Sequence, residues 1–408
     1  MQALVFHPTI PRYLLTRALG QVWSAAYWSP AAPIALRQVP EPPLPGPEWV
    51  RVRVRLGGIC GSDLHLLTLQ TSPATSVFAS FPFVPGHENV GVVVETGPSA
   101  RDLQPGQRVV VEPLLPCRAR GVAQSCAPCT RGDYHLCVQT TDGHLSPGLM
   151  VGACRDTGGS WGETFVAHRS QVFPVPGGVS DENALLSEPA ACALHSLLRN
   201  PPREGATALV VGGGAIGQAL VACLRALGLG VRVVALVKYP HQAEMARRLG
   251  ADHAVRLRGT DGHYEELAEL LRARVLRPML GKRVLVGGAE WVVDCVGSGR
   301  SLDDAFRLAG PGGTVVVLGL ASFPEGVDWT PVWLKELRVV GSYTYALERW
   351  EGRAVRTLEL VLDWMARGRL DLGALVTHRF PISRYREAFR TALGKAQANA
   401  FKVAFAFA

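Results

Sequence analysis

The stretch Val210-Val211-Gly212-Gly213-Gly214-Ala215-Ile216-Gly217 joins a short apolar run to a helical pattern. Its first glycine permits a tight turn, its third lets the backbone approach a pyrophosphate, and its last allows a helix to pack closely on a strand. The amino end of the following helix favours phosphate charge. The stretch therefore predicts a dinucleotide site. The residues expected to bind the cofactor are Gly212, Gly214, Ile216 and Gly217.

Around this motif, short apolar runs alternate with helical patterns. Runs at 208–211, 231–237, 291–295 and 314–318 predict strands, and 215–227, 243–249 and 302–308 predict helices. Such alternation is typical of a parallel sheet covered by helices on both faces. The pattern breaks near Gly341. We expect an α/β fold with a doubly wound Rossmann domain over residues 190–345.

The choice between NAD and NADP depends on the end of the second predicted strand. An acidic residue about twenty positions after the glycine motif ordinarily holds the adenosine ribose of NAD. This chain has Leu236 and Val237 there, followed by Lys238. No carboxylate repels a 2′-phosphate, and Lys238 can pair with it. NADP is therefore favoured, unless Val237 packs on the adenine while Lys238 is merely solvated.

The amino-terminal half has a different pattern. From Val50 to Leu56, apolar residues alternate with arginines, as in a strand with one face buried. Further short strands are predicted at 90–95, 108–112 and 163–166, separated by Gly/Pro turns. Strands of this length in series predict a compact, mostly antiparallel, barrel-like domain.

Two kinds of metal-binding pattern lie in this half. Cys60, His87, Glu88 and, further on, Glu188 offer a thiolate, an imidazole and carboxylates, which zinc accepts as ligands. A catalytic zinc needs three protein ligands and one open position. Four more of the nine cysteines are Cys117, Cys126, Cys129 and Cys137. In a large chain without an export signal, such clustering favours metal over disulfides.

In combination, these motifs resemble the zinc-containing medium-chain alcohol dehydrogenases, in particular the polyol and threonine dehydrogenase branch. The resemblance runs from about Trp49 to about Phe401 and is carried by Gly58–His65, Pro85–Glu88, the cysteine cluster, Glu188-Pro189 and the glycine motif. It implies a GroES-like catalytic domain over residues 1–189, completed by 346–408, with the active-site cleft beside the dinucleotide-binding domain.

The resemblance also implies roles for single residues. Cys60 and His87 would bind the catalytic zinc, with Glu88 or Glu188 as the third ligand, directly or through water. Ser62 would contact the substrate alcohol, and His65 would carry its proton out by way of the cofactor ribose. The alternative for His65 is a partly exposed histidine that relays no proton.

The run Cys126-x2-Cys129-x7-Cys137 is similar to the structural zinc lobe of the family. There another cysteine stands three positions before Cys126, where this chain has Ala123. Cys117 could replace it, because the cost of closing the longer loop grows slowly with length. Four thiolates would then close a tetrahedral site. Otherwise three of the thiols are simply buried, or the lobe has lost its metal.

We therefore predict zinc-dependent hydride transfer between NAD(P) and a secondary alcohol or polyol, or its carbonyl product, by a homodimer or homotetramer. One alternative is a zinc-independent alkene or quinone reductase of the same superfamily. Another is a nucleic-acid-binding protein that uses the zinc lobe and the net charge of +8. The basic residues are dispersed, so we expect neither a nucleic-acid nor a membrane partner.

The first forty residues fit the family pattern least. A strand at 1–6 and a brief amphipathic helix at 11–20 are expected, within an insertion of some twenty residues. A flap over the cleft, an oligomer contact or plain decoration would each account for it. The amino terminus lacks a basic region before a long apolar core, and no apolar run is long enough to span a bilayer. A cytoplasmic location is expected.

Overall fold

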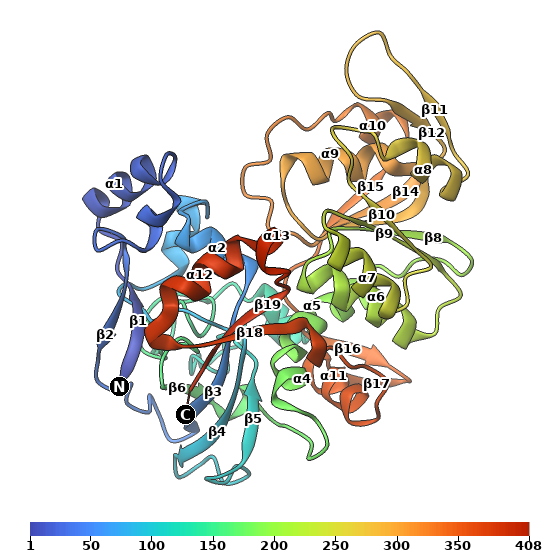
Figure 1. Ribbon diagram of the computed structural model, residues 1–408. Coiled ribbons are helices and arrows are strands. Elements are labelled where there is room, and N and C mark those ends of the chain that lie inside the picture. The colour runs from blue at the N-terminus through green and yellow to red at the C-terminus, as the bar shows by residue number, and fades with distance from the viewer. Residues whose placement is uncertain (408) are drawn as a thin grey trace. The chain divides into compact units, whose positions relative to one another are not determined.

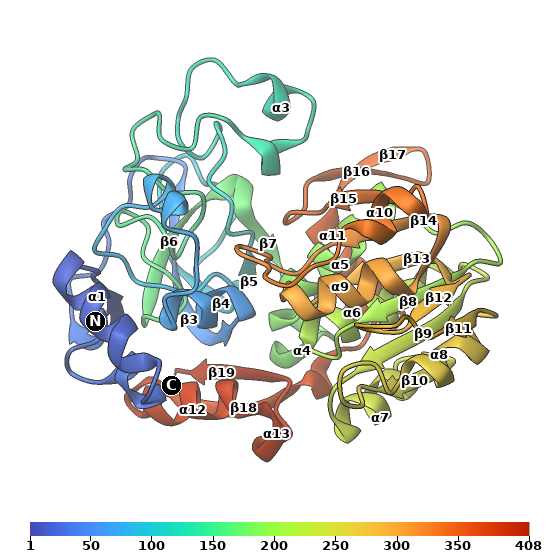
Figure 2. The same ribbon diagram turned by 90° about the horizontal axis from the view of Figure 1, so that it is seen from above.

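The computed structural model describes residues 1–407, which form two compact units. Unit 1 comprises Met1–Glu188 and Ala346–Ala408, and unit 2 comprises Pro189–Tyr345. Figures 1 and 2 show the helices and strands from two directions. None of the helices within residues 1–407 combines the length and the apolar character that crossing a membrane would require.

Unit 2 is built on a six-stranded parallel sheet, which confirms the predicted fold class. The strand order is β10-β9-β8-β13-β14-β15, with every neighbouring pair parallel. The strands are β8 (Thr207–Val211), β9 (Arg232–Val237), β10 (His253–Arg256), β13 (Ala289–Asp294), β14 (Ala309–Val317) and β15 (Arg338–Gly341). The central strands β8, β9 and β13 are almost wholly buried, as expected of strands covered on both faces, whereas the edge strand β15 has no buried residue.

The helices of unit 2 cover this sheet. They are α5 (Ser187–Arg199, which begins in unit 1), α6 (Ala215–Leu227), α7 (Pro240–Arg248), α8 (Tyr264–Leu270), α9 (Gly299–Leu308) and α10 (Thr330–Leu334). Helix α6 starts directly after the glycine motif, with Gly214 as its N-cap. A Cβ on Gly217 would come within 1.9 Å of the Gly212 carbonyl oxygen, so only glycine fits there.

One part of unit 2 has no counterpart among the sequence predictions. Strands β11 (Arg274–Leu276) and β12 (Val284–Val286) form an antiparallel hairpin, whose loop extends away from the rest of the unit (Figure 1). Lys282 fastens the loop by contacts of 2.7 Å with Asp303 and 2.9 Å with Asp304. The turn itself carries the fully exposed side chains of Met279 and Leu280.

Unit 1 contains a seven-stranded, mostly antiparallel sheet in the order β18-β19-β3-β4-β5-β7, with β6 also paired to β3. Only β18 and β19 run parallel. The strands are β3 (Trp49–Ile59), β4 (Asn89–Thr96), β5 (Arg108–Val111), β6 (Thr164–His168), β7 (Val172–Pro174), β18 (Val376–Pro381) and β19 (Lys402–Ala406). In β3 the valines are buried, whereas Arg53 and Arg55 are exposed, as the alternation predicts.

The last segment of the chain belongs to unit 1, because β19 pairs antiparallel with β3. This pairing places Val403 opposite Ile59, next to Cys60. The remaining elements of this segment are β16 (Leu347–Trp350), β17 (Arg353–Arg356), α11 (Thr357–Ala366), α12 (Tyr385–Leu393) and α13 (Lys395–Ala398).

The amino-terminal elements of unit 1 include a second, two-stranded sheet, β1 (Gln2–Phe6) with β2 (Ile34–Gln38). Between these strands lie helix α1 (Ile10–Gly20) and the 3₁₀ helix η1 (Ser24–Trp28). The other short helices of unit 1 are α2 (Gly61–Leu67), η2 (Pro73–Phe78), α3 (Ala127–Thr130), η3 (Tyr134–Leu136), η4 (Arg169–Gln171), α4 (Asp181–Leu185), η5 (Gly373–Leu375) and η6 (Ile382–Arg384).

Candidate metal centres and cofactor site

Two neighbouring strands bring Cys60, His87 and Glu88 together. Cys60 follows β3 and caps α2, while His87 and Glu88 immediately precede β4. Because β3 and β4 pair with Gly57 opposite Asn89, the end of β3 and the start of β4 lie side by side. The potential ligand atoms of the three residues all lie within 4.8 Å of one another.

The ring of His87 is oriented by its neighbours. Its Nδ1 lies 3.4 Å from Oδ1 of Asp63, and its Nε2 lies 3.5 Å from Oγ of Ser62. Burial acts to lower the pKa of His87, but Asp63 and Cys60 outweigh it and raise that pKa well above the ordinary value. With Nδ1–H directed at the Asp63 carboxylate, the lone pair of Nε2 is available to a metal. A metal would displace a proton from this ring.

Glu88 is held by a lysine from the far end of the chain. Nζ of Lys402 lies 2.5 Å from one carboxylate oxygen of Glu88 and 2.6 Å from the other. Both side chains are buried. Burial acts to lower the pKa of Lys402, but the charges of Glu88, Cys60 and Glu188 raise it overall. The Lys402 ammonium therefore offsets part of the negative charge of Glu88, Cys60 and Glu188.

The structure also places the other residues predicted for this centre. Glu188 is buried near the start of α5, and its charge contributes to the raised pKa of Lys402. His65 lies half-buried in the last turn of α2. Burial, and to a lesser extent the positive charge of Lys395, lowers the pKa of His65. His65 therefore stays neutral, and able to accept a proton, at a lower pH than an exposed histidine.

Sequence reasoning missed Asp63, Lys402 and Lys395 at this centre. Asp63 and Lys402 had a signal in the sequence. Asp63 stands three residues after Cys60, where its carboxylate accepts the Cys60 N–H at 2.8 Å. Lys402 is the only charged residue in the apolar tail from Phe401 to Ala408. A lone lysine in a buried strand requires an acidic partner.

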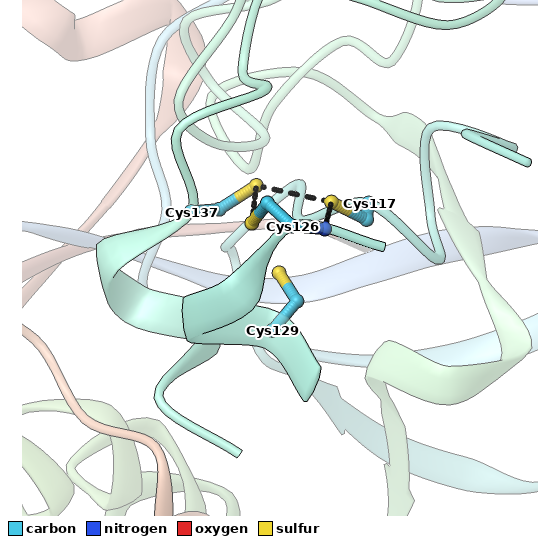
Figure 3. Close-up of side chains that lie close together, drawn as sticks. All are labelled: Cys117, Cys126, Cys129 and Cys137. Atoms are coloured by element: carbon cyan, nitrogen blue, oxygen red, sulfur yellow. Dashed lines mark hydrogen bonds between the residues drawn. The ribbon is translucent and has the colours of Figure 1, made fainter. Parts of the chain in front are cut away.

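The four cysteines of the second cluster point toward one another (Figure 3). Sγ of Cys137 lies 3.6 Å from that of Cys117 and 3.8 Å from that of Cys126. Zinc–sulfur bonds of about 2.3 Å in a tetrahedral site place sulfurs roughly 3.8 Å apart. The cluster therefore fits a zinc ion, and Cys117 supplies the fourth thiol, while Ala123 is exposed.

The four thiols differ in how readily they ionise. Burial raises the pKa of Cys129 and raises that of Cys137 to about 11, whereas the environment of Cys126 favours the thiolate. Burial acts to raise the pKa of Cys126, but hydrogen bonds from the backbone of Cys129 and Val138 and from other thiols outweigh it and lower that pKa to about 7. The backbone N–H of Cys126 also donates to Sγ of Cys117 at 3.3 Å. Thiolates, rather than thiols, bind zinc.

A buried ion pair fastens the cysteine lobe (residues 117–137) to the sheet of unit 1. Tyr134 of the lobe donates to the Glu112 carboxylate at 3.2 Å, and Arg356 pairs with the same oxygen at 2.6 Å. The Arg356 guanidinium also lies 4.9 Å from the ring centres of Tyr134 and Phe173. The lobe is thus held both by its thiols and by this contact.

In unit 2, the glycine motif lies between β8 and α6, as predicted. Val237 ends β9 and is buried, whereas Lys238 is exposed, with Nζ 5.4 Å from the centre of the Tyr239 ring. The backbone N–H groups of Lys238 and Tyr239 both donate to Oε1 of Gln242. This turn leaves the ammonium of Lys238 accessible from solvent.

Family profiles of known proteins match segments of both units. The family profile for the GroES-like domain of alcohol dehydrogenases matches residues 46–177, and that of the zinc-binding dehydrogenases matches 215–359. L-Idonate 5-dehydrogenase from Vitis vinifera is 30% identical over 363 residues, covering 88% of each chain. The chain belongs to the zinc-containing medium-chain dehydrogenase family.

Further relatives of this dehydrogenase support the same branch. L-Threonine 3-dehydrogenase from Rhizobium johnstonii is 30% identical over 361 residues, covering 88% of this chain and 92% of its own. A protein from Sinorhizobium meliloti, solved bound to NADP, matches with a TM-score of 0.69 and 26% identity, covering 92% of this chain and 96% of its own. The predictions of family and of an NAD(P)-dependent zinc dehydrogenase acting on CH–OH groups are confirmed.

Proposed function

We propose that this dehydrogenase oxidises a secondary alcohol or polyol, or reduces the matching carbonyl compound, at the centre formed by Cys60, His87 and Glu88. The convergence of a thiol, an oriented imidazole and a carboxylate within 4.8 Å carries the proposal. The relatives named for L-idonate and L-threonine favour hydroxy acids and sugar derivatives as the substrate class.

The donor set fits a zinc ion with an open position for substrate. A zinc ion held there would supply Lewis-acid polarisation of the substrate oxygen, and a bound nicotinamide would supply the hydride acceptor. Cys60 and Nε2 of His87 would hold the metal. Asp63 fixes the ring of His87, and Lys402 fixes the carboxylate of Glu88.

We infer that Glu88, rather than Glu188, is the third protein ligand. Glu88 has an oxygen within 4.8 Å of the other two donors, and it is already oriented by Lys402. Glu188 then contributes negative charge from nearby. Glu88→Gln should lower the zinc content of the protein, whereas Glu188→Gln should retain the zinc. The reverse pattern of zinc contents would assign the ligand to Glu188.

The proton of the alcohol needs a path to solvent. Ser62 lies beside His87, with its Oγ 3.5 Å from Nε2, which supports a contact between this hydroxyl and the substrate oxygen. His65 lies half-buried one turn further along α2, with a lowered pKa that keeps it a proton acceptor. We assign the relay to these two side chains. The four-cysteine lobe would hold a second, structural zinc with no open position.

For the cofactor, we propose a modest preference for NADP over NAD. No carboxylate stands at the end of β9, and the exposed Lys238 offers a flexible point charge to a 2′-phosphate. An exposed pair of this kind contributes about 1 kcal/mol, which corresponds to roughly a fivefold preference. Lys238→Ala should remove most of it, and added salt should weaken it. A clear preference of the wild type for NAD would refute this assignment.

We also propose self-association of unit 2, as a homodimer or a larger even-numbered assembly. Strand β15 is an edge strand of the parallel sheet, and the preceding helix α10 exposes Trp333 and Leu334, with Trp329 exposed at its N-cap. An unpaired edge beside large exposed apolar side chains is typical of an interface. Light scattering should give a mass above that of one chain, and Trp333→Ser with Leu334→Ser should lower it.

The substrate class is tested by initial rates with polyols, sugar acids and hydroxy amino acids, each with NAD and with NADP. Turnover of at least one such alcohol, abolished in Cys60→Ser, is the expected result. Reduction of alkenes or quinones that persists after zinc removal would instead support a zinc-independent reductase.

A further inference from the structure

Helix α1 lies at the rim of unit 1 in both views (Figures 1 and 2). One side of it faces the protein. Thr16 is buried and donates to the Ala31 carbonyl, and Tyr13 donates to the Leu69 carbonyl at 3.4 Å. A Cβ on Gly20 would come within 2.3 Å of the Tyr27 ring, so the helix packs closely on η1 there. This side fixes the orientation of α1.

The opposite side of α1 is apolar and open to solvent. The exposed fractions run from 38% for Leu19 to 88% for Val22. The residues of this outward face are Ile10, Leu14, Leu15, Leu19, Val22 and Trp23. A surface helix of a globular protein ordinarily buries its apolar stripe and exposes its polar one. The reversed arrangement indicates that the outward face contacts something other than water.

Charge indicates what that partner is. The first forty residues contain no aspartate or glutamate. Arg12 and Arg17 lie on α1 itself and form no ion pair within residues 1–407. A symmetric contact between two copies through this face would bring these arginines together, at an electrostatic cost. An anionic surface would instead complement them.

The composition of the outward face matches that of helices that lie in a membrane interface. Such helices combine an apolar face with basic residues, and they often carry a tryptophan at the depth of the lipid headgroups. Trp23 would take this position here. The eleven residues of α1 are far too few to cross a bilayer. Against the expectation from the dispersed basic residues of the whole chain, we propose that α1, with Val22 and Trp23, binds this dehydrogenase peripherally to anionic lipid surfaces.

This surface is separate from the dehydrogenase chemistry. The match to the GroES-like family profile begins at residue 46, beyond α1. None of its outward residues belongs to the proposed zinc or cofactor sites. Loss of lipid binding should therefore leave turnover in solution unchanged.

The test is co-flotation of the full-length protein with vesicles of phosphatidylcholine alone and of phosphatidylcholine with phosphatidylglycerol. The protein should float only with the anionic vesicles, and less at high salt. Leu14→Ser with Leu15→Ser should abolish flotation, because the apolar contact is lost. Arg12→Gln with Arg17→Gln should weaken binding by about fivefold per arginine.

A control is available on unit 2, where Met279→Ser with Leu280→Ser removes two apolar side chains from the β11–β12 turn that are more exposed than Leu14 and Leu15. This variant should float like the wild type. Absence of flotation with anionic vesicles would overturn the proposal, as would flotation that the α1 variants leave unchanged. A mass in light scattering that falls on Leu14→Ser with Leu15→Ser would show that α1 instead contacts a second copy.

Discussion

The two candidate metal centres of unit 1 differ in how the chain assembles them. The cysteine lobe takes all four donors from one segment, 117–137, and offers four ligands of one type. The Cys60 centre takes its donors from the ends of β3 and β4 and its supporting charge, Lys402, from β19. A closed set of thiolates satisfies a metal fully, whereas a mixed set of three leaves one position for substrate.

The two centres also differ in whether a metal would serve mainly stability or mainly catalysis. At the lobe, the metal would replace packing that a short, loop-rich segment cannot supply by itself. At the Cys60 centre, the buried pair of Glu88 and Lys402 also holds the surrounding strands together, so we expect this part of the fold to depend less on zinc. The two centres should therefore respond differently to the loss of a ligand.

The largest effect is expected from Cys60→Ser. Loss of this thiolate should lower kcat/KM by more than about 100-fold, beyond what changes around a metal ligand usually cost. The unfolding temperature should stay close to that of the wild type. Steady-state kinetics, zinc analysis and thermal unfolding of the same sample check this. Activity of the Cys60→Ser protein close to that of the wild type would show that Cys60 is not a ligand of the catalytic centre.

Next in size is the buried pair between Glu88 and Lys402. Lys402→Met leaves the carboxylate buried without its cation and should destabilise unit 1 by about 3–5 kcal/mol. The double variant Glu88→Gln with Lys402→Met is the matched control and should be markedly more stable than Lys402→Met alone. Equal stabilities of the two variants in chemical denaturation would show that the pair contributes little.

The same pair has a defined pH dependence. The pKa of Lys402 is raised in the folded protein. Its contribution to stability is therefore fully present below the ordinary pKa of lysine, and is lost only as the pH rises through the raised value. Wild-type stability should fall at strongly alkaline pH, and the double variant should lack this component of the fall.

A smaller effect is expected at the lobe. Cys129→Ser should lower the unfolding temperature by about 10 °C, because a structural metal is lost while the rest of the core remains. Cys117→Ser should behave alike if Cys117 completes the site. Ala123→Ser, in the same loop but exposed, is the control and should leave the unfolding temperature unchanged. If Cys117→Ser unfolded at the same temperature as the wild type, Cys117 would not be a ligand and the site would have only three cysteines.

The smallest effect concerns His65 and depends on pH. The pKa of His65 is lowered, so it remains a base below the ordinary titration range of histidine. Alcohol oxidation by His65→Gln should therefore fall furthest behind the wild type at acidic pH. Lys395→Met should raise the pKa of His65 and move the acid limb of the wild-type profile to higher pH. Parallel profiles for wild type and His65→Gln would mean that the proton leaves by another route.

Much of this organisation could be predicted from local sequence. The glycine motif and the alternation after it are local patterns, and they predicted the sheet of unit 2. The spacing of Cys117 from Cys126 left its role open, and the structure brings the two sulfurs into one cluster. These features depend on residues that are close along the chain, or on periodicity within one element.

The contacts that could not be predicted from the sequence join residues that are far apart along the chain. Glu88 and Lys402 meet only because β19 returns to β3, 314 residues further along the chain. Likewise, an amphipathic pattern predicted the helix α1 but not which side faces the protein. That depends on Thr16 and Gly20 fitting against Ala31 and Tyr27. Such choices are made by tertiary packing, which overrides local preference.

The most direct test of the difference between the two centres is a titration of zinc content against activity. Zinc is removed stepwise with a chelator, and both bound zinc and alcohol oxidation are measured on each sample. Activity should vanish with the first of two zinc ions per chain, while the fold and the second zinc remain. Adding zinc back should restore activity. Full activity in protein stripped of all its zinc would contradict a catalytic role for the Cys60 centre.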